Sequence, residues 1–349
     1  MFGAKGIVGL DIGSSYLKAV QLKETRSGYE LELFETLPIS PELIVEGSII
    51  DAIRLTESLR ELVRKASIKT KDAVISISGH SSVIIKRISL PEMSEEELSE
   101  SIKFEAEQYV PFDIEDVNLD FQILGPKEEP GQMDVILVAV KKDVINDYVT
   151  VVREAGLSTV VVDVDAFAME NMYGINYEVE PGKNVALVNI GASTVNMNIL
   201  KGGVSVFTRD SSIGSNIHTD ALQKEFNIAY EEAERLKRGE PIEKVRPEEA
   251  SALIVNASNE IFSEVSRSLD YFKSSTLQAD VQEVILSGGC ALIRDFPGLL
   301  SEKIGIPVML AQPLKNIVIP KKFDVTLIEE LAPIGAVAVG LAIRRPGDR

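Results

Sequence analysis

The sequence predicts an α/β protein made of two similar halves. Short apolar strand patterns alternate with amphipathic helix patterns along the chain of 349 residues. The strand–turn–strand pattern that opens the chain around residue 11 returns around residue 189, about half the chain later. A repeat on this scale predicts a duplicated pair of domains with a cleft between them. We place domain 1 at residues 1–180 and domain 2 at residues 181–349.

The composition indicates a globular protein that does not bind nucleic acid. Hydrophobic residues make up 45% of the chain and charged residues 26%, as in folded globular domains. The formal net charge of −18 repels nucleic-acid backbones and anionic lipid surfaces alike. The single cysteine, Cys290, cannot form an intramolecular disulfide, which fits a reducing compartment. We therefore expect a cytoplasmic protein without direct membrane insertion.

The first half begins with three strand patterns. Residues 6–12 are apolar, residues 16–22 alternate, and residues 29–37 alternate again after a turn at Gly28. An amphipathic helix follows, and residues 73–78 form the next strand. This order of strands, helix and strand predicts the opening layer of domain 1.

A compact strand–helix–strand–strand unit is expected as an insert in domain 1, at about residues 80–140. Ser94 and Glu97 form a capping box that opens its helix, and Pro111 closes that helix. Its strands are expected at residues 83–90, 117–124 and 134–140. A further helix then leads into a strand at residues 159–164.

The second half repeats the opening of the first. Its strands are expected at residues 185–190, 195–200, 204–208 and 283–286. A mainly helical, nucleotide-side part is expected at about residues 212–260. The apolar stretch at residues 331–343 is shorter than the roughly 18 residues of a membrane span and contains Pro333. We interpret it as a buried helix that returns to the interdomain region.

Two turns made of glycine and small residues predict a phosphate site. They contain Gly13, Ser14 and Ser15 in the first half and Gly191, Ala192, Ser193 and Thr194 in the second. Such turns let backbone N–H groups point at an anion without obstruction by a Cβ atom. One such turn alone is more often a plain hairpin, but two at equivalent positions indicate a polyphosphate held from both sides.

Other residues extend this hypothesis to Mg²⁺ and ATP. Asp11 stands at a strand end and suits hydrated Mg²⁺, which prefers carboxylates and waters. Lys18 on the following strand can reach a terminal phosphate, an interaction worth ~1.5–3 kcal/mol. A strand that runs into Gly288 and Gly289 leaves room for a flat adenine ring. Without the other motifs, that glycine pair would as often be a plain strand-to-helix turn.

These motifs, in this order, resemble those of the actin, heat-shock chaperone and sugar-kinase superfamily. The resemblance covers almost the whole chain and implies an actin-like, ribonuclease H-like duplicated ATPase fold that binds ATP with Mg²⁺. Residues 233–239 resemble the nucleotide-side helix of that superfamily, which brings Glu234, Lys237 and Arg238 to the ribose and base. We also assign Gly214 to the expected cofactor site.

The insert resembles that of FtsA-type proteins, and residues 104–112 resemble the PilM family of type IV pilus assembly proteins. This resemblance implies a cytoplasmic adaptor at the inner-membrane assembly platform of the pilus. Such an adaptor binds the cytoplasmic N-terminal tail of a PilN-like single-pass protein and reaches the membrane through it, with other platform or motor components as further partners. Tyr109, Phe112 and Phe121 are our candidates for a peptide groove, although aromatic residues in a small insert are more often core.

One departure from the superfamily pattern bears on catalysis. Asn189 begins the second phosphate turn, where hydrolysing members usually carry aspartate. An amide cannot take a proton from water or give a charge to Mg²⁺, so we expect slow or absent hydrolysis. Asp11, Asn189 and Asp165 are candidates for positioning water or Mg²⁺, with no confident catalytic residue among them. Asp163 is an alternative to Asp165, and a structural role for both is equally open.

Two other functions also stay open from the sequence. Small-molecule kinases share the superfamily, but no acceptor motif with a carboxylate base is recognisable here. Cytoskeletal relatives such as FtsA form ATP-dependent filaments through head-to-tail contacts, and the sequence contains no signal against such contacts.

Overall fold

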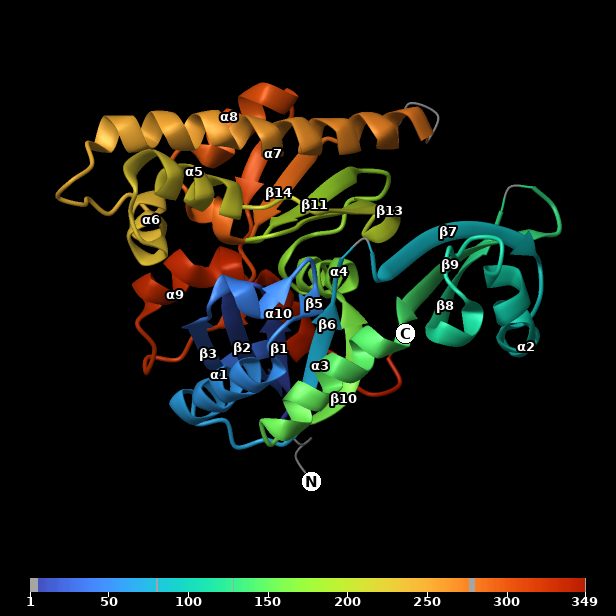
Figure 1. The fold of residues 1–349 in the computed structure, drawn as a ribbon. Helices are drawn as coiled ribbons and strands as arrows, with labels where there is room; N and C mark the ends of the chain where they lie inside the picture. Colours follow the sequence, from blue (N-terminus) through green and yellow to red (C-terminus); the bar gives the residue numbers. More distant parts are fainter. Residues whose placement is uncertain (1–5, 80, 128, 276–279, 349) are drawn as a thin grey trace.

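The computed structural model describes residues 6–79, 81–127, 129–275 and 280–348 (Figure 1). The start of the expected insert at residue 80 lies outside the described residues, as do residues 1–5. The α-helices are α1 (Ala52–Lys65), α2 (Glu95–Ala106), α3 (Lys142–Glu154), α4 (Asp165–Asn176), α5 (Asn216–Phe226), α6 (Tyr230–Lys237), α7 (Pro247–Ser275), α8 (Phe296–Ile304), α9 (Val325–Leu331) and α10 (Ala336–Ala342).

The strands belong to two large and two small sheets. Their bounds are β1 (Val8–Ile12), β2 (Tyr16–Thr25), β3 (Gly28–Pro38), β4 (Ile44–Val45), β5 (Ser48–Ile49), β6 (Asp72–Ile77), β7 (Val83–Pro91), β8 (Val117–Pro126), β9 (Gln132–Lys141), β10 (Ser158–Val164), β11 (Asn184–Ile190), β12 (Val195–Lys201), β13 (Val204–Ser211), β14 (Glu283–Ser287), β15 (Val308–Leu310) and β16 (Ile317–Val318).

The first large sheet has the strand order β10-β6-β1-β2-β3-β16. Strands β1, β2 and β3 form an antiparallel meander, and β6 and β10 continue the sheet in parallel with β1. Asp11 on β1 pairs in register with Lys18 on β2, so both residues stand near the turn end of this hairpin. The outer strand β16 comes from near the end of the sequence and runs parallel to β3. The first sheet is therefore completed by a strand from the second half.

The second large sheet repeats this arrangement, with the order β13-β12-β11-β14-β15. The corresponding strands of the first sheet are β3-β2-β1-β6-β10. In both sheets an antiparallel meander is followed by two parallel strands. This match confirms the duplicated α/β architecture predicted from the repeat.

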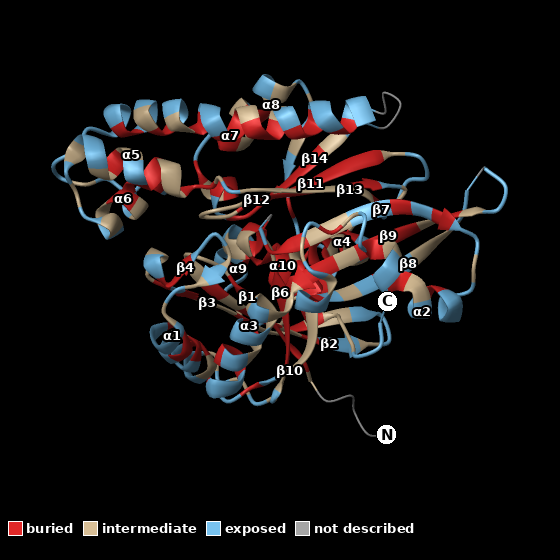
Figure 2. Cartoon of the chain, turned by 45° about the vertical axis from the view of Figure 1, so that its right-hand side comes forward, coloured by how far each residue is buried: buried red, intermediate tan, exposed pale blue. Residues whose placement is uncertain are grey.

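Helices α4 and α10 form the shared core between the two sheets. Every one of the seven residues of α10 is buried, and this central region is coloured red in Figure 2. One apolar cluster joins α4 and α10 to side chains of both sheets. At Gly340 a Cβ atom would stand only 1.7 Å from the carbonyl oxygen of Ala168, so only glycine permits this helix contact. The two halves are thus joined through one tightly packed helix pair.

The apolar segment near the end of the chain is a core element, as expected from its composition. By length and hydropathy, the window Val325–Ala342 would suffice to cross a membrane, but 61% of it is buried inside the protein. It consists of α9, the 3₁₀ turn Ala332–Gly335 and α10 rather than one regular helix. Pro333 lies within that 3₁₀ turn.

The insert has its own sheet, in the order β7-β9-β8, with α2 packed beside it. The predicted capping box is present, because Ser94 Oγ accepts from the Glu97 N–H at 3.2 Å and Glu97 Oε2 accepts from the Ser94 N–H at 2.7 Å. A separate apolar cluster fills the space between this sheet and α2. In Figure 1 the insert projects from the side of the molecule, away from α1.

Several elements differ from the sequence prediction. Helix α4 follows β10 directly and was not predicted, and α7 continues to Ser275, well past the expected end of the helical part at residue 260. The very short strands β4, β5, β15 and β16 were also missed. Strands of two or three residues are too short for an alternating pattern to be recognised.

Candidate functional site

A cavity of about 470 Å³ lies where the two halves meet. It is lined by all but one of the residues predicted for the nucleotide site. These are Asp11, Gly13, Ser14, Ser15, Lys18, Asn189, Gly191, Ala192, Ser193, Thr194, Glu234, Lys237, Arg238, Gly288 and Gly289, together with Asp165. A volume of this size is in the range of cofactor sites, roughly 300–1,000 Å³.

The two glycine turns face each other across this cavity. We call residues 13–15 the first turn and residues 191–194 the second turn. The hydroxyl oxygens of Ser14 and Ser193 lie 2.8 Å apart and share a hydrogen bond. Within the described part of the chain, no residue accepts a hydrogen bond from the backbone N–H groups of Ser14, Ser15, Ala192 or Ser193. These donors therefore remain available to an anion such as a phosphate.

Gly214 is the predicted cofactor residue that does not line the cavity. It lies behind the second turn, where a Cβ atom would stand 2.5 Å from the carbonyl oxygen of Ala192. The neighbouring Ser215 N–H donates to Gly191 O at 2.9 Å, and the Asn216 N–H donates to Ala192 O at 2.8 Å. The structure thus places Gly214 as a support of the second turn rather than as a direct contact of a cofactor.

Asp11 and Lys18 form an ion pair at the edge of the first turn. Lys18 Nζ donates to Asp11 Oδ2 at 2.7 Å, and Asp11 is only 9% exposed. In the described residues, no group of three or more His, Cys, Asp or Glu side chains is arranged to hold a metal ion. A single carboxylate suits Mg²⁺, which keeps most of its waters and is held mainly by phosphate oxygens.

Asp165 is the first residue of α4 and faces the cavity. Its Oδ1 accepts a hydrogen bond from Ser76 Oγ at 2.5 Å. Burial, helped by the negative charge of Asp11, raises the pKa of Asp165 to about 7. Its carboxyl is therefore partly protonated at neutral pH. Asp163 instead forms an ion pair with Arg344 at 2.9 Å and does not line the cavity.

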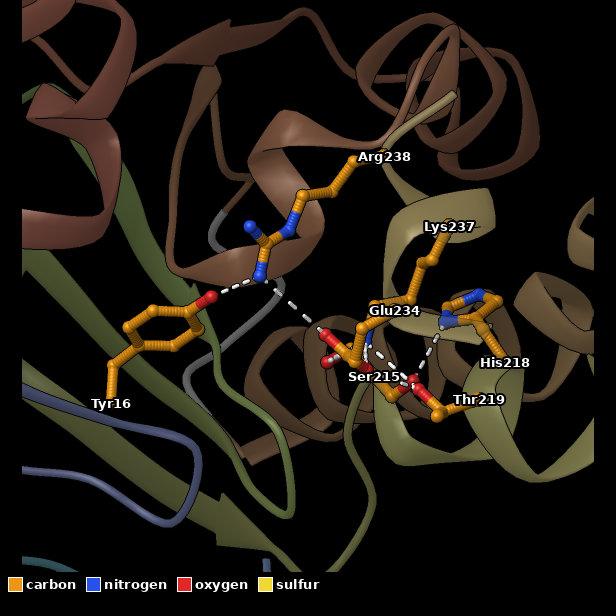
Figure 3. A network of polar contacts seen from close by, with 7 residues as sticks. All are labelled: Tyr16, Ser215, His218, Thr219, Glu234, Lys237 and Arg238. Atoms are coloured by element: carbon orange, nitrogen blue, oxygen red, sulfur yellow. Dashed lines mark hydrogen bonds and ion pairs between the residues drawn. The ribbon is translucent and has the colours of Figure 1, made fainter. Parts of the chain in front are cut away.

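Glu234 and Lys237 of α6 form the centre of a buried polar network at the other end of the cavity (Figure 3). Lys237 is only 7% exposed and donates to Glu234 Oε1 and, at 3.0 Å, to Thr219 Oγ1. Thr219 Oγ1 in turn donates to the same Glu234 oxygen at 2.5 Å. Because each charge has a partner, the network holds Glu234 and Lys237 in fixed positions beside the cavity.

His218 supports this network from behind. Its Nδ1 lies 3.1 Å from Ser215 O and its Nε2 lies 2.9 Å from Ser258 Oγ. Burial, together with the positive charge of Lys237, lowers the pKa of His218 to about 4. The imidazole is therefore neutral at physiological pH and serves as a structural hydrogen-bonding residue.

Arg238 connects the two halves across the mouth of the cavity. Its guanidinium donates to the hydroxyl of Tyr16 in the first sheet, as Figure 3 shows. The guanidinium carbon also lies 5.4 Å from the centre of the Tyr16 ring. Since Arg238 follows α6 and Tyr16 begins β2, this contact bridges the cleft.

Gly288 and Gly289 directly follow β14, and only Gly288 requires glycine for its backbone. Gly288 has φ of +87°, and a Cβ atom there would stand 2.4 Å from the carbonyl oxygen of Ile190. At Gly289 the nearest atom to a Cβ would be Ser215 Oγ at 3.9 Å. Asn189 is held close by, with its Oδ1 accepting from Ser287 Oγ at 3.2 Å. Leu292 and Ile293, which follow this glycine pair, also line the cavity.

A second hollow of about 520 Å³ lies on the insert, between α2 and the segment 112–115. We call it the insert groove. Its lining residues are Glu100, Lys103, Phe104, Glu107, Phe112, Asp113, Ile114 and Glu115.

Of the predicted partner residues, Phe112 lines the insert groove, whereas Tyr109 packs against the core of the insert. Phe121 is 9% exposed and belongs to that core, so its assignment to a peptide surface is corrected. It sits on the half-buried strand β8, whose alternation does not reveal which face is covered. Phe104 was missed as a candidate, although it is 76% exposed in the groove.

The sequence interpretation also missed some residues of this cavity. Tyr16, Ser76 and Ser215 line it without having been predicted. Tyr16 and Ser215 stand next to recognised motif residues, so a wider motif window would have included them. Tyr148 comes from α3, and no local pattern links that helix to the cavity.

Comparisons with known proteins agree with this geometry. The family model described as type IV pilus assembly protein PilM matches residues 9–346. The structure titled "PilM-PilN type IV pilus biogenesis complex" has 28% identity and a TM-score of 0.86, and the alignment covers 99% of this chain and 100% of the other.

Two more distant structures share the fold alone. The ethanolamine utilization protein EutJ from Carboxydothermus hydrogenoformans has 17% identity and a TM-score of 0.58, covering 96% of this chain and 88% of the other. MreB5 of Spiroplasma citri bound to ADP has 15% identity and a TM-score of 0.52, covering 97% and 95%. The expected actin-like fold is thereby confirmed. Because the family model spans nearly the whole sequence, this chain belongs to the PilM family of type IV pilus assembly proteins.

Proposed function

We propose that this chain is an ATP-binding adaptor of the type IV pilus assembly platform that binds the cytoplasmic N-terminal tail of a PilN-like membrane protein. The observation that carries the proposal is the cavity between the two facing turns, in a chain of the PilM family. In this proposal residues 1–180 and 181–349 act as two domains that close on the nucleotide. The protein works in the cytoplasm and reaches the inner membrane through its partner.

The residues around the cavity fit the parts of ATP from one end to the other. The free N–H groups of the two turns and Lys18 face the position of the phosphates. Asp11 would hold Mg²⁺ through water, and the bound ion would neutralise phosphate charge. Arg238, Gly288 and Gly289 line the end where the ribose and adenine would lie.

We further propose that hydrolysis is slow or absent. Asn189, at the start of the second turn, can neither take a proton from an attacking water nor give a formal charge to Mg²⁺. A steady-state turnover of about 1 s⁻¹ or more would contradict this part of the proposal. Measuring phosphate release by the wild type and by Asn189→Asp tests it, because the aspartate is expected to raise the rate.

The insert groove offers a surface for the tail. Four carboxylates and one cation, Lys103, line it, and Lys103 is paired with Glu115 at 3.1 Å. The exposed ring of Phe104 and the ring of Phe112 supply apolar contacts. This combination favours a short segment that carries both an apolar and a basic side chain.

The decisive experiment is a calorimetric titration of the full chain with Mg-ATP against the N-terminal peptide of a PilN-like protein. We expect saturable binding near one-to-one, weakened roughly tenfold by Phe104→Ser. The matched control is Ile53→Ser, because Ile53 on α1 is 75% exposed and Phe104 is 76% exposed. A scrambled peptide should not bind.

Either outcome is informative. Equal effects of the two substitutions would place the tail elsewhere on the protein while leaving the adaptor role intact. No binding to the folded, ATP-loaded protein would refute the adaptor role and favour a filament-forming or kinase function.

A further inference from the structure

The insert is attached to the first sheet at one small joint. Strand β6 ends at Ile77, and the Gly79 carbonyl accepts from the N–H groups of Ser82 and Val83 at 3.0 and 2.9 Å. The returning strand β9 closes the joint, because the Lys141 N–H donates to Ser82 O at 3.1 Å. We call residues 77–79 and 81–83, with the ends of β9 and β10, the joint. Its buried apolar side chains form a small cluster made of Ile77, Val83, Val140 and Val164.

A carboxylate from the other half of the molecule binds this joint. Asp210 lies near the end of β13 in the second sheet, and its Oδ2 accepts a hydrogen bond from the Gly79 N–H at 3.0 Å. Gly79 is buried and has φ of +120°, a conformation that residues with a Cβ rarely adopt. The position of the second sheet is therefore tied to the backbone from which the insert begins.

The same joint borders the nucleotide cavity. Three polar residues in or next to the joint line the cavity: Ser76, Ser78 and Asp165. The two serines flank Ile77, and Asp165 follows Val164. On the other side, Asp210 pairs in register with Asn196 of β12, two residues after Thr194 of the second turn. A shift of the second turn relative to the first sheet would move Asp210 and the joint together.

The insert groove is anchored at the opposite end of the joint. Lys142 Nζ donates to Glu115 O at 2.5 Å, and Lys141 Nζ lies 4.5 Å from the centre of the Phe112 ring. Lys141 is the last residue of β9, the strand that closes the joint, and Lys142 is the first residue of α3. The groove wall at residues 112–115 thus contacts Lys141 and Lys142, and Lys141 is linked through the Ser82 backbone to Gly79, the residue that Asp210 binds.

We infer that Asp210 is the positioning residue through which closure of the two halves on a nucleotide sets the orientation of the insert and its affinity for a peptide. This inference rests on the proposed function, since it assumes that both ligands bind. Asp210 itself lines neither the nucleotide cavity nor the insert groove. Its substitution should therefore change the coupling between the two ligands and leave each separate affinity nearly intact.

Thermodynamic linkage supplies the test. The dissociation constant of the PilN-like peptide is measured with and without Mg-ATP, and that of ATP with and without peptide, in the full chain. For the wild type we expect each ligand to strengthen the other by the same factor, about tenfold. Asp210→Ala should reduce this factor to below about twofold, while each affinity measured alone changes by less than about threefold.

Two variants make the result specific. Asp210→Asn keeps an oxygen that can accept from the Gly79 N–H, so it should retain most of the coupling and guards against a folding defect of the alanine variant. Asp220→Ala is the matched control, because Asp220 is an exposed carboxylate on α5 of the same half. It should leave the coupling unchanged. Coupling that persists in a folded Asp210→Ala protein would overturn the inference and leave the adaptor function standing.

A second measurement does not need the peptide. Hydrogen exchange of the joint should slow when Mg-ATP is added to the wild type and should not slow in Asp210→Ala. Equal slowing in both proteins would also overturn the inference. The linkage experiment also measures ATP binding to the wild type by itself. If the wild type does not bind ATP, the proposed function is refuted, and not only this inference.

Discussion

The hydroxyl oxygens of Ser14 and Ser193 lie 2.8 Å apart, although 178 positions separate the equivalent motif residues Asp11 and Asn189 in the sequence. This contact joins the tips of two hairpins that belong to different sheets. The hydroxyls and free N–H groups of both tips therefore converge on one cavity. Such convergence allows a chain of phosphates to be held from two sides, and it makes the distance between the halves sensitive to the ligand between them.

We predict that Gly288→Ala and Gly289→Ala affect different properties of the protein. A methyl group at residue 288 would meet Ile190 O at 2.4 Å with a φ of +87°, so stability should fall by about 1–3 kcal/mol. At residue 289 the nearest atom is 3.9 Å away, so stability should stay within about 0.5 kcal/mol while ATP affinity falls. Urea unfolding and ATP titration measure the two effects. Equal losses of stability would contradict the prediction.

Asp11→Asn should remove the effect of Mg²⁺ on ATP binding. The variant loses the carboxylate that would orient the hydrated ion, so the gain in ATP affinity on adding Mg²⁺ should fall by roughly tenfold. Without Mg²⁺, ATP binding should be unchanged or tighter, because one negative charge near the phosphates is gone. Titrations in Mg²⁺ and in EDTA decide this, with Asp220→Asn as control. Weaker binding in EDTA would indicate that Asp11 has another role.

Lys237→Met should strongly destabilise the nucleotide-free protein. Lys237 is 7% exposed, and its removal leaves the largely buried Glu234 carboxylate with only the more distant Arg238 guanidinium, at 3.9 Å, as a cation, at a cost of about 2–3 kcal/mol. Arg235→Met on the same helix breaks only the exposed pair with Glu240 and should cost less than about 1 kcal/mol. Urea unfolding compares the two variants, and similar shifts of the midpoint would argue against a buried charge network.

His218 should make stability fall as the solution becomes acidic. Its pKa is lowered from 6.5 to about 4 in the folded protein, so below pH 6.5 the unfolded chain binds a proton that the folded chain does not. This contribution is fully present above pH 6.5 and is lost as the pH falls toward 4, with about 2 kcal/mol lost between pH 7 and pH 5.

The measurement for His218 is the difference in pH dependence between the wild type and His218→Gln. The variant lacks the titrating group, so its unfolding free energy should vary less between pH 7 and pH 5, whatever its absolute stability. Parallel pH profiles of the two proteins would show that His218 does not titrate in this range.

The cavity between the two halves was largely predictable because its parts are local turns. At Gly13 and Gly288 a Cβ atom would stand 3.1 Å from Tyr16 O and 2.4 Å from Ile190 O, and a need for glycine of this kind can be recognised in the sequence. Helix α4 was missed for a physical reason. It is buried on most sides, including Ala168 and Met172, so it lacks the polar face that reveals an amphipathic helix.

Contacts between the two halves could not be predicted from the sequence. The pair of Tyr16 with Arg238 and that of Asp210 with Gly79 depend on how the two sheets face each other, which no local pattern encodes. Phe121 shows that the buried face of a strand is also difficult to predict. A half-buried strand predicts that alternate residues are covered, but the choice of the covered face follows from the position of α2.

The pairing of β16 with β3 has a consequence for synthesis of the chain. The edge strand β3 leaves the ribosome roughly 280 residues before β16, which at about 5–20 residues per second is a delay of about 15–60 s. Helix α10, the buried layer between the sheets, emerges later still. The nascent first half therefore carries an open strand edge and uncovered apolar side chains for most of translation. Its folding can be completed only after α10 emerges, so termination before α10 should release a fragment that needs chaperones.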